Sequence, residues 1–260
     1  PAAPIVVQQP ARQAAEIPAL KSRDVAIIGM AGRFAGSEDL DALWAAIAAG
    51  QTMFRSAPQD GRAWPTDTAL PAGYMDGADQ FDPLFFSISP AEAMQMDPQE
   101  RLFLQTAYHA MEHAGYAPQA LSRQGRVAVL AGVMNAHYPS RAAFWSVANR
   151  LSFMFDFKGP SLSCDTACSS SAAALVLAMD MLRAGRCDVA IAGGVNVIAH
   201  PRHLASHAAL GIQSRQGRLR PFSADADGML SGEGAGVVIL KLLDRALADG
   251  DRIEGVLRGA

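Results

Sequence analysis

The sequence has few cysteines and no long apolar run. Three of its 260 residues are cysteine, and their spacing suits neither a disulfide framework, a redox pair nor a zinc site. The apolar runs all fall short of the roughly 20 residues that a transmembrane helix needs. The start of the chain shows no charged-then-apolar signal peptide. These absences predict a cytoplasmic protein that is not held in a membrane.

Charge is also sparse, and its balance argues against nucleic-acid binding. Only 18% of the residues are charged and the formal net charge is -3, which leaves no basic footprint for nucleic acid. The glycines of the 29–32 turn lack the G-x-G-x-x-G spacing that binds dinucleotides, and the sequence contains no P-loop. Arg215, Arg218 and Arg220 form one basic cluster, which is either a solvated loop or a contact for an acidic partner.

The apolar residues are numerous enough for a large core, and they follow an alternating pattern. Hydrophobic residues make up 50% of the sequence. Short, continuously apolar runs predict buried strands, whereas cap and turn residues delimit helices. The predicted strands are 25–30, 127–133, 189–192 and 234–242, and the predicted helices are 39–49, 97–115 and 243–248. Strands that alternate with helices favour an α/β fold with a mainly parallel sheet.

Three polar residues are predicted to begin helices. Ser37 is the expected N-cap of the 39–49 helix, because acidic residues follow it in the first turn. Ser89 opens a capping box with Glu92 and has a proline at the first helical position. Asp97 is followed by proline in the same way, so we expect it to open the helix that ends at Gly115.

The segment 165–171 (DTACSSS) places a single thiol between a short strand and a helix. The helix, 169–183, has almost no polar face, and Gly185 is a typical C-terminal stop. A helix that is apolar on every side is a buried central helix. Cys168 is therefore predicted at the positive end of a buried helix dipole, where a thiolate is stabilised. The alternative is that Cys168 is a small buried hydrophobic residue, as most free cysteines are.

This segment resembles the nucleophile motif of the β-ketoacyl synthases, the condensing enzymes of fatty acid and polyketide assembly. Further segments resemble landmarks of the same family and follow the family's order over residues 24–260. They are 85–93 (FFSISPAEA), 96–101 (MDPQER), 149–152 (NRLS), 193–196 (GGVN), 220–223 (RPFS) and 232–234 (GEG). The sequence is most similar in style to the ketosynthase domain of a modular polyketide synthase.

The resemblance implies the thiolase-like fold, in which two βαβαβαββ halves pack into a five-layered α/β/α/β/α condensing enzyme. Residues 23–260 are expected to form the N-terminal half, and the C-terminal half is absent from this chain. Residues 1–22, which are rich in Ala, Pro and Gln, are interpreted as an interdomain linker. The connections 60–73 and 138–149 are short for the family.

The resemblance also implies the chemistry. A condensing enzyme accepts an acyl group on a thiolate, here Cys168, and joins it to a carbanion made by decarboxylating a malonyl thioester. Backbone N–H groups at the helix start, that of Cys168 included, are placed to stabilise an oxyanion. Asp165 and Thr166 are expected to fix the turn through hydrogen bonds, and Ser169 and Ser170 to cap it.

None of the six histidines matches a catalytic motif of the family. The catalytic histidines and the lysine of the family belong to the second half, so the chain is expected to be active only when that half completes it. His109 and His113 have a spacing that suits a metal, but no third ligand is evident. His200, His203 and His207 follow an apolar strand and are expected on the surface.

The resemblance implies protein partners and no cofactor. Substrates arrive on the phosphopantetheine arm of an acyl carrier protein, and the 215–220 region is one candidate contact for it. Met134 and Asn135 match the family loop near the acyl pocket and the dimer interface. The segment 149–163 matches the part that pairs across the two-fold axis of the family's homodimer. Plain packing accounts for either match equally well.

Two other functions stay open at the level of the sequence. One is a catalytically silent ketosynthase-like scaffold or dimerisation unit. Cys168 argues against silent forms that replace the nucleophile, but not against loss of a histidine in the second half. The other is a cysteine hydrolase, which needs a histidine beside Cys168. The sequence gives no support for one.

Overall fold

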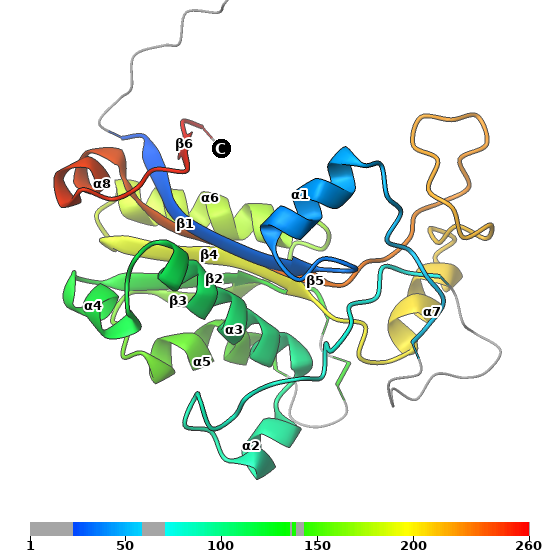
Figure 1. Ribbon diagram of the computed structural model, residues 1–260, viewed down its shortest axis with the longest axis horizontal. Coiled ribbons are helices and arrows are strands. Elements are labelled where there is room, and N and C mark those ends of the chain that lie inside the picture. Colours follow the sequence, from blue (N-terminus) through cyan, green and yellow to red (C-terminus); the bar gives the residue numbers. More distant parts are fainter. Residues whose placement is uncertain (1–22, 59–70, 136, 139–142, 260) are drawn as a thin grey trace, which may run out of the picture.

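The computed structural model describes residues 23–58, 71–135, 137–138 and 143–259. Its centre is one six-stranded sheet with the order β3-β2-β4-β5-β1-β6 (Figure 1). The strands are β1 (Val25–Phe34), β2 (Val127–Gly132), β3 (Ser161–Cys164), β4 (Val189–Asn196), β5 (Gly234–Leu242) and β6 (Gly255–Leu257). The predicted linker, and parts of the two short connections, lie outside the described residues.

Four of the strands run in the same direction. β2 is parallel to β3 and to β4, and β1 shares their direction because β5 is antiparallel to both β4 and β1. β6 is antiparallel to β1. The prediction of a mainly parallel sheet therefore holds for strand direction but not for pairing, since β5 lies between β4 and β1. An apolar pattern identifies a strand without specifying its neighbours.

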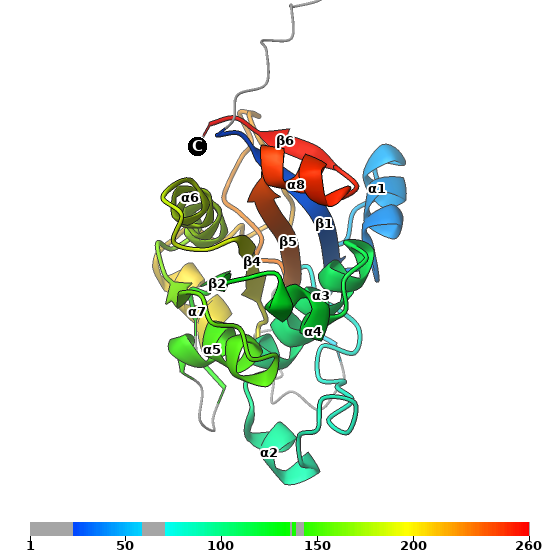
Figure 2. The same ribbon diagram turned by 90° about the vertical axis from the view of Figure 1, so that its left-hand side faces the viewer.

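Helices cover both faces of the sheet. α6 (Ser170–Arg183) packs on one face, whereas α3 (Pro98–His113) and α5 (Phe144–Met154) pack on the other (Figure 2). The shorter helices are α1 (Leu40–Ala48), α2 (Pro90–Gln95), α4 (Pro118–Arg123), α7 (Arg202–Ala209) and α8 (Leu243–Asp249). The main elements follow the order β1-α3-β2-α5-β3-α6-β4-β5. This is the predicted βαβαβαββ half, and it supplies three of the expected five layers.

Each face of the sheet has its own apolar core. β2 is buried at every position, as its continuous apolar run predicts. Val129 enters the core shared with α3 and α5, whereas its neighbour Leu130 enters the core beneath α6. Because both faces of the sheet are covered in this way, polar groups with a chemical role are confined to the strand ends and the loops that follow them.

The structure confirms two of the three predicted N-cap residues, Ser89 and Asp97. Ser89 Oγ accepts from the N–H of Glu92 at 3.1 Å, and Asp97 Oδ1 accepts from the N–H of Gln99 at 2.9 Å. The prediction of Ser37 as the cap of α1 is wrong. Asp39 is the N-cap and accepts from the Ala42 N–H at 2.7 Å. The backbone of Ser37 is instead paired with that of Phe34, which delays the helix by two residues.

α6 is buried on one side only. Its sheet-facing residues, among them Ala174, Ala178 and Met179, are fully buried. Leu177, on the opposite face, is exposed. A helix with almost no polar face therefore packs on the sheet with one side and leaves its other side uncovered in the described part of this chain. None of the helices in the described part of the chain is long and apolar enough to cross a membrane.

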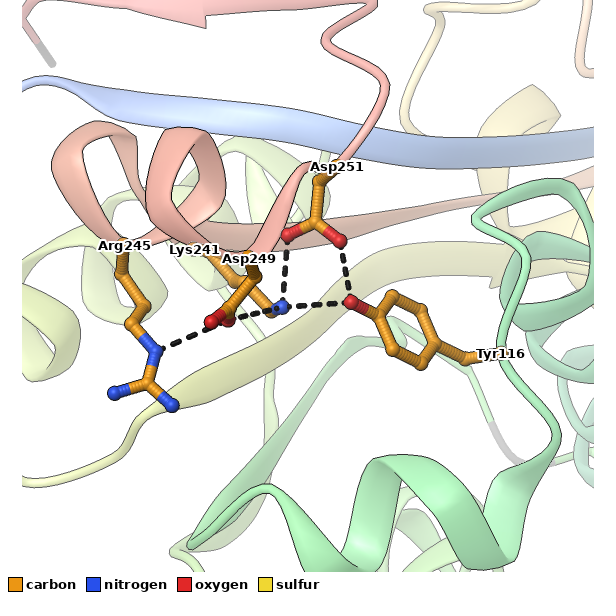
Figure 3. A network of polar contacts seen from close by, with 5 residues as sticks. All are labelled: Tyr116, Lys241, Arg245, Asp249 and Asp251. Atoms are coloured by element: carbon orange, nitrogen blue, oxygen red, sulfur yellow. Dashed lines mark hydrogen bonds and ion pairs between the residues drawn. The ribbon is translucent and has the colours of Figure 1, made fainter.

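A buried ionic network fixes one end of the sheet (Figure 3). The Lys241 side chain, only 1% exposed, donates to Asp249 at 2.9 Å and to Asp251 at 2.8 Å. It also donates to the Tyr116 hydroxyl at 3.0 Å. Burial by itself would lower the pKa of Lys241, but the hydrogen bonds to Asp251, Tyr116 and Asp249 outweigh burial and raise it. The charged lysine therefore joins β5, α8 and the segment after α3.

Candidate active site

Cys168 lies in the turn between β3 and α6, at the N-terminal end of the helix, and its side chain is exposed. It lines a groove of about 650 Å³. The other sides of the groove are made by residues at the ends of β2, β4 and β5, including Met134, Asn196 and Glu233. The predicted nucleophile is thus open to a ligand. The alternative reading of Cys168 as a small buried residue is wrong.

Hydrogen bonds within the turn hold Cys168 in this position. Asp165 Oδ1 accepts from the N–H of Ala167 at 2.8 Å, and Ser170 Oγ accepts from the N–H of Thr166 at 2.9 Å. Ala167 has a φ of 56°, in the left-handed region that residues other than glycine rarely adopt. The predicted roles of Asp165 and Thr166 in the turn are confirmed. Ser169 is the N-cap residue by position, but its hydroxyl donates to the Thr166 carbonyl and caps no helical N–H.

Two glycines allow the start of α6 to lie directly against the sheet. A Cβ atom at Gly132 would lie 2.5 Å from the carbonyl carbon of Ser170. At Gly194 it would lie 2.6 Å from the Cβ of Ser171. These distances leave no space for a side chain, so glycine at the ends of β2 and β4 sets how closely the Cys168 turn approaches the sheet.

The environments of the other two cysteines disfavour a thiolate. Cys164 is partly buried, and burial together with the Asp165 carboxylate raises the pKa of its thiol. Burial, with a smaller contribution from Asp188, raises the pKa of Cys187 to about 11. The thiolate is the nucleophilic form of cysteine, and burial disfavours it at Cys164 and Cys187. Cys168 is also the only one of the three thiols that is exposed.

The groove contains a polar wall whose residues, Asn196 and Glu233, belong to two of the family landmarks but were assigned no role from the sequence. The Glu233 carboxylate is buried and accepts from the N–H groups of Met75 and Ile198, each at 2.8 Å. Asn196 Nδ2 donates to the carbonyl of Gly232 at 2.7 Å. These bonds join the segments after β4 and before β5. The available signal was an acidic residue between two glycines, Gly232 and Gly234.

The surface prediction for the histidines of the 200–207 segment is wrong for two of them. His203 and His207 are 3% and 9% exposed, and both lie on the inner side of α7. The apolar residues between them are too few to show from sequence which face α7 buries. Among the described residues, no histidine lines the Cys168 groove, and no group of three ligands suits a metal.

A larger hollow of about 770 Å³ lies between α1 and α3. His109 and His113 line it. His109 Nδ1 lies 3.1 Å from Glu112 Oε2, and His113 Nδ1 accepts from the N–H of Met30 at 3.2 Å. No cysteine lines this hollow. The Cys168 groove, though smaller, is therefore the better candidate for a reaction with a thioester.

The fold and the exposed cysteine agree with the class of protein that the sequence motifs resemble, and the family comparison identifies the family. The model of the family described as "Beta-ketoacyl synthase, N-terminal domain" matches residues 22–246. This chain belongs to the β-ketoacyl synthase family. It is 43% identical to polyketide synthase PksM of Bacillus subtilis over 252 residues, which cover 93% of this chain and 6% of PksM. It is 42% identical to polyketide synthase ThaG of Burkholderia thailandensis, covering 95% of this chain and 5% of ThaG.

Solved ketosynthase domains share the fold. The oxazolomycin ketosynthase domain OzmH KS7 of Streptomyces albus matches with a TM-score of 0.85 and 39% identity over 90% of this chain. The ketosynthase from module 6 of the bacillaene synthase of Bacillus subtilis matches with a TM-score of 0.85 and 37% identity. This chain spans 44% and 42% of those two domains. The thiolase-like fold class is confirmed.

Proposed function

We propose that this chain is the acyl-accepting part of a β-ketoacyl synthase that works in polyketide assembly. Cys168 is its nucleophile and forms an S-acyl-cysteine intermediate. The observation that carries the proposal is the exposed Cys168 thiol at the N-terminal end of α6, inside a groove, while Cys164 and Cys187 are withdrawn from solvent. The thiolate attacks the carbonyl carbon of an acyl thioester. A bond to Sγ forms as the bond to the donor sulfur breaks, and the donor leaves as a thiol after taking a proton.

The turn supplies an oxyanion site for this step. The N–H of Cys168, in the turn just before α6, has no hydrogen-bond acceptor among the described residues. An N–H at a helix N-terminus carries partial positive charge, which stabilises the negative oxygen of a tetrahedral intermediate. The following step is a decarboxylative Claisen condensation, and we assign its histidines and lysine to a C-terminal half that completes the enzyme.

We further propose a homodimer in the cytoplasm that receives its substrates from an acyl carrier protein and uses no cofactor. The residues 23–260 form the N-terminal half of the enzyme in this proposal. Phe153 of α5 and Leu162 of β3 are exposed apolar side chains on neighbouring elements. They lie in the segment assigned to the two-fold axis, and a second copy would cover them.

The acylation step is tested by mapping the site of reaction. The ketosynthase completed by its C-terminal half is treated with iodoacetamide or with an acyl thioester, and the adduct is located by peptide mass spectrometry. We expect Cys168 to react at least roughly tenfold faster than either other cysteine, because burial raises the pKa of both. Preferential modification of Cys164 or Cys187 contradicts the proposal. Acylation without condensation supports a silent scaffold.

The carrier-protein contact is tested at the basic cluster. Arg215 and Arg218 are exposed on a loop that Asp227 organises through bonds from the N–H groups of Arg215 and Gln216, at 3.0 and 3.1 Å. The double variant Arg215→Glu, Arg218→Glu should slow acyl transfer from the carrier protein by roughly tenfold, because complementary charge speeds encounter. Transfer from a small thioester should not change. An equal loss with both donors indicates a structural role for the two arginines.

A further inference from the structure

The strands β2 and β4 separate at the end that carries the Cys168 groove. Their parallel ladder ends with the pair Gly132 and Gly194, the two glycines on which the start of α6 rests. If the same register continued, Asn135 would lie opposite Val197, three residues beyond that pair. The backbones of these two residues are instead joined through a side chain of α3.

The side chain that joins them is Gln99. Its Nε2 donates to the carbonyl of Asn135 at 2.8 Å, and its Oε1 accepts from the N–H of Val197 at 3.3 Å. A carbonyl can only accept and a backbone N–H can only donate, so an amide, with a donor beside an acceptor, serves both. Two hydrogen bonds and an amide group take the place of one direct hydrogen bond. The strand ends are therefore held further apart than in the ladder.

Gln99 is itself held in place. It lies in the first turn of α3 and is 1% exposed. Its backbone N–H donates to the N-cap residue Asp97 at 2.9 Å, and Asp97 Oδ2 lies 3.5 Å from its Nε2. The helix packs on β1, β4 and β5. α3 thus presents a fixed amide to the two strand ends.

Both residues that the amide holds are next to residues that line the groove. Asn135 directly follows Met134, and Val197 directly follows Asn196. Met134 and Asn196 line the groove on its β2 side and its β4 side. A further bond, from Asn135 Nδ2 to Asn196 Oδ1 at 2.7 Å, links the two sides. The spacing that the amide imposes is therefore passed on to two walls of the groove.

We propose that Gln99 is a positioning residue for the acylation of Cys168. By spacing the ends of β2 and β4, it sets the width of the groove in which an acyl thioester meets the thiol. The proposal rests on the proposed role of Cys168 as the acyl acceptor. Gln99 does not line the groove and acts through Met134 and Asn196. A reacting carbonyl has to lie about 3–3.5 Å from its nucleophile, and a misplacement of about 1 Å can cost on the order of 100-fold in rate.

The test is Gln99→Met in the ketosynthase completed by its C-terminal half. Methionine keeps the length of the side chain and makes neither hydrogen bond, so the strand ends lose their fixed spacing. The acyl donor is the N-acetylcysteamine thioester of butanoate. We expect the limiting rate of Cys168 acylation to fall at least roughly tenfold, while the half-saturating donor concentration changes less than about threefold. Alkylation by iodoacetamide, which needs only the exposed thiol, should change less than about twofold.

Two control variants separate positioning from loss of stability. Gln105→Met makes the same substitution on the same helix, at a residue that lines the hollow between α1 and α3. Lys241→Met weakens the fold at the opposite end of the sheet. At a temperature where each protein stays folded, neither control should change the rate of acylation or of alkylation.

Four results distinguish the inference from its alternatives. Equal acylation by wild type and Gln99→Met overturns it. A loss in Lys241→Met as large as that in Gln99→Met also overturns it, because stability alone then explains the effect. An equal loss of acylation and alkylation in Gln99→Met overturns it too, since the thiol and not the groove has then changed. Failure of the wild-type protein to acylate Cys168 overturns the proposed function instead.

Gln99→Glu keeps the inference testable where Gln99→Met does not fold. A protonated carboxyl offers an O–H donor and an acceptor, so it can still bridge Asn135 and Val197, whereas a carboxylate repels the Asn135 carbonyl. Burial and the nearby Asp97 raise the pKa of the introduced carboxyl. The acylation rate relative to wild type, a ratio that cancels the titration of the thiol, should therefore rise as the pH falls from about 9 to about 6. A ratio that does not change with pH overturns the inference.

Discussion

The backbone conformation of Ala167 determines where the Cys168 thiol lies. Its left-handed backbone, with a φ of 56°, turns the chain from β3 into α6 and leaves the next side chain, Cys168, exposed. The turn is stabilised by side chains within five residues of it, above all Asp165 and Ser170. Strain of this kind persists where the surrounding contacts determine the backbone, and here they determine where the thiol lies.

Ala167→Val is expected to lower the free energy of unfolding by about 1–3 kcal/mol, because a β-branched residue is a strong outlier at positive φ. Alkylation of Cys168 should slow as the turn relaxes to a different backbone conformation. Ala167→Gly is the control, since glycine adopts this conformation freely and should keep both properties. Urea denaturation and the rate of iodoacetamide labelling measure the two effects. Identical labelling of all three proteins would show that the turn does not control the thiol.

At the scale of elements, close packing at glycines and a buried ion pair determine which helices and strands contact each other. Gly132 and Gly194 bring α6 onto β2 and β4, while Lys241 joins β5 to α8 and to Tyr116. The two glycines and the Lys241 network lie at opposite ends of the sheet. The glycines position the Cys168 turn, and Lys241 fixes the long strand β5, whose first residues line the Cys168 groove.

Lys241→Met should destabilise the completed ketosynthase by about 3–5 kcal/mol, because it leaves the Asp251 carboxylate buried without a cation. Arg245→Ala is the matched control. Arg245 also pairs with Asp249, at 3.0 Å, but it is exposed, so its loss should change stability little. Urea denaturation followed by circular dichroism measures both. A Lys241→Met protein as stable as wild type would mean that the network contributes nothing to the fold.

At the scale of the whole molecule, the uncovered side of α6 is the main unpartnered surface near the site. Leu177 and Ala172 are exposed on it, and Cys168 lies at its N-terminal end. Soluble monomers rarely expose large contiguous apolar patches. We propose that a C-terminal half covers this face, and we assign to the same half the histidines that the proposed condensation needs.

Residues 1–260 alone should therefore neither condense acyl and malonyl thioesters nor persist as a stable monomer. Losing one preorganised electrostatic group commonly costs on the order of 100- to 1000-fold in rate, and here all those of the second half are lost. The measurement is expression of the chain alone, followed by addition of the second half in trans, with size-exclusion chromatography and a condensation assay. A monodisperse, cooperatively folded chain that condenses unaided would contradict both the function and the assignment of the α6 face.

The sequence by itself determined the local features of this protein. Buried strands, the caps at Ser89 and Asp97, and the strand–turn–helix around Cys168 depend on residues close together in the chain, so apolar patterns and cap residues were sufficient to predict them. The same holds for the roles of Asp165 and Thr166 in the turn. Family landmarks along the chain then led to the fold class.

Only the tertiary structure decided what depends on contacts distant in sequence. The place of β5 between β4 and β1, the burial of His203 and His207, and the Glu233 bonds to Met75 and Ile198 all join segments far apart in the chain. Asp39 replaced Ser37 as a cap for the related reason that backbone pairing with Phe34 competes with helix formation. Packing selects among the many partners that each local pattern permits, because burial and hydrogen bonding are satisfied by the whole fold rather than by a segment.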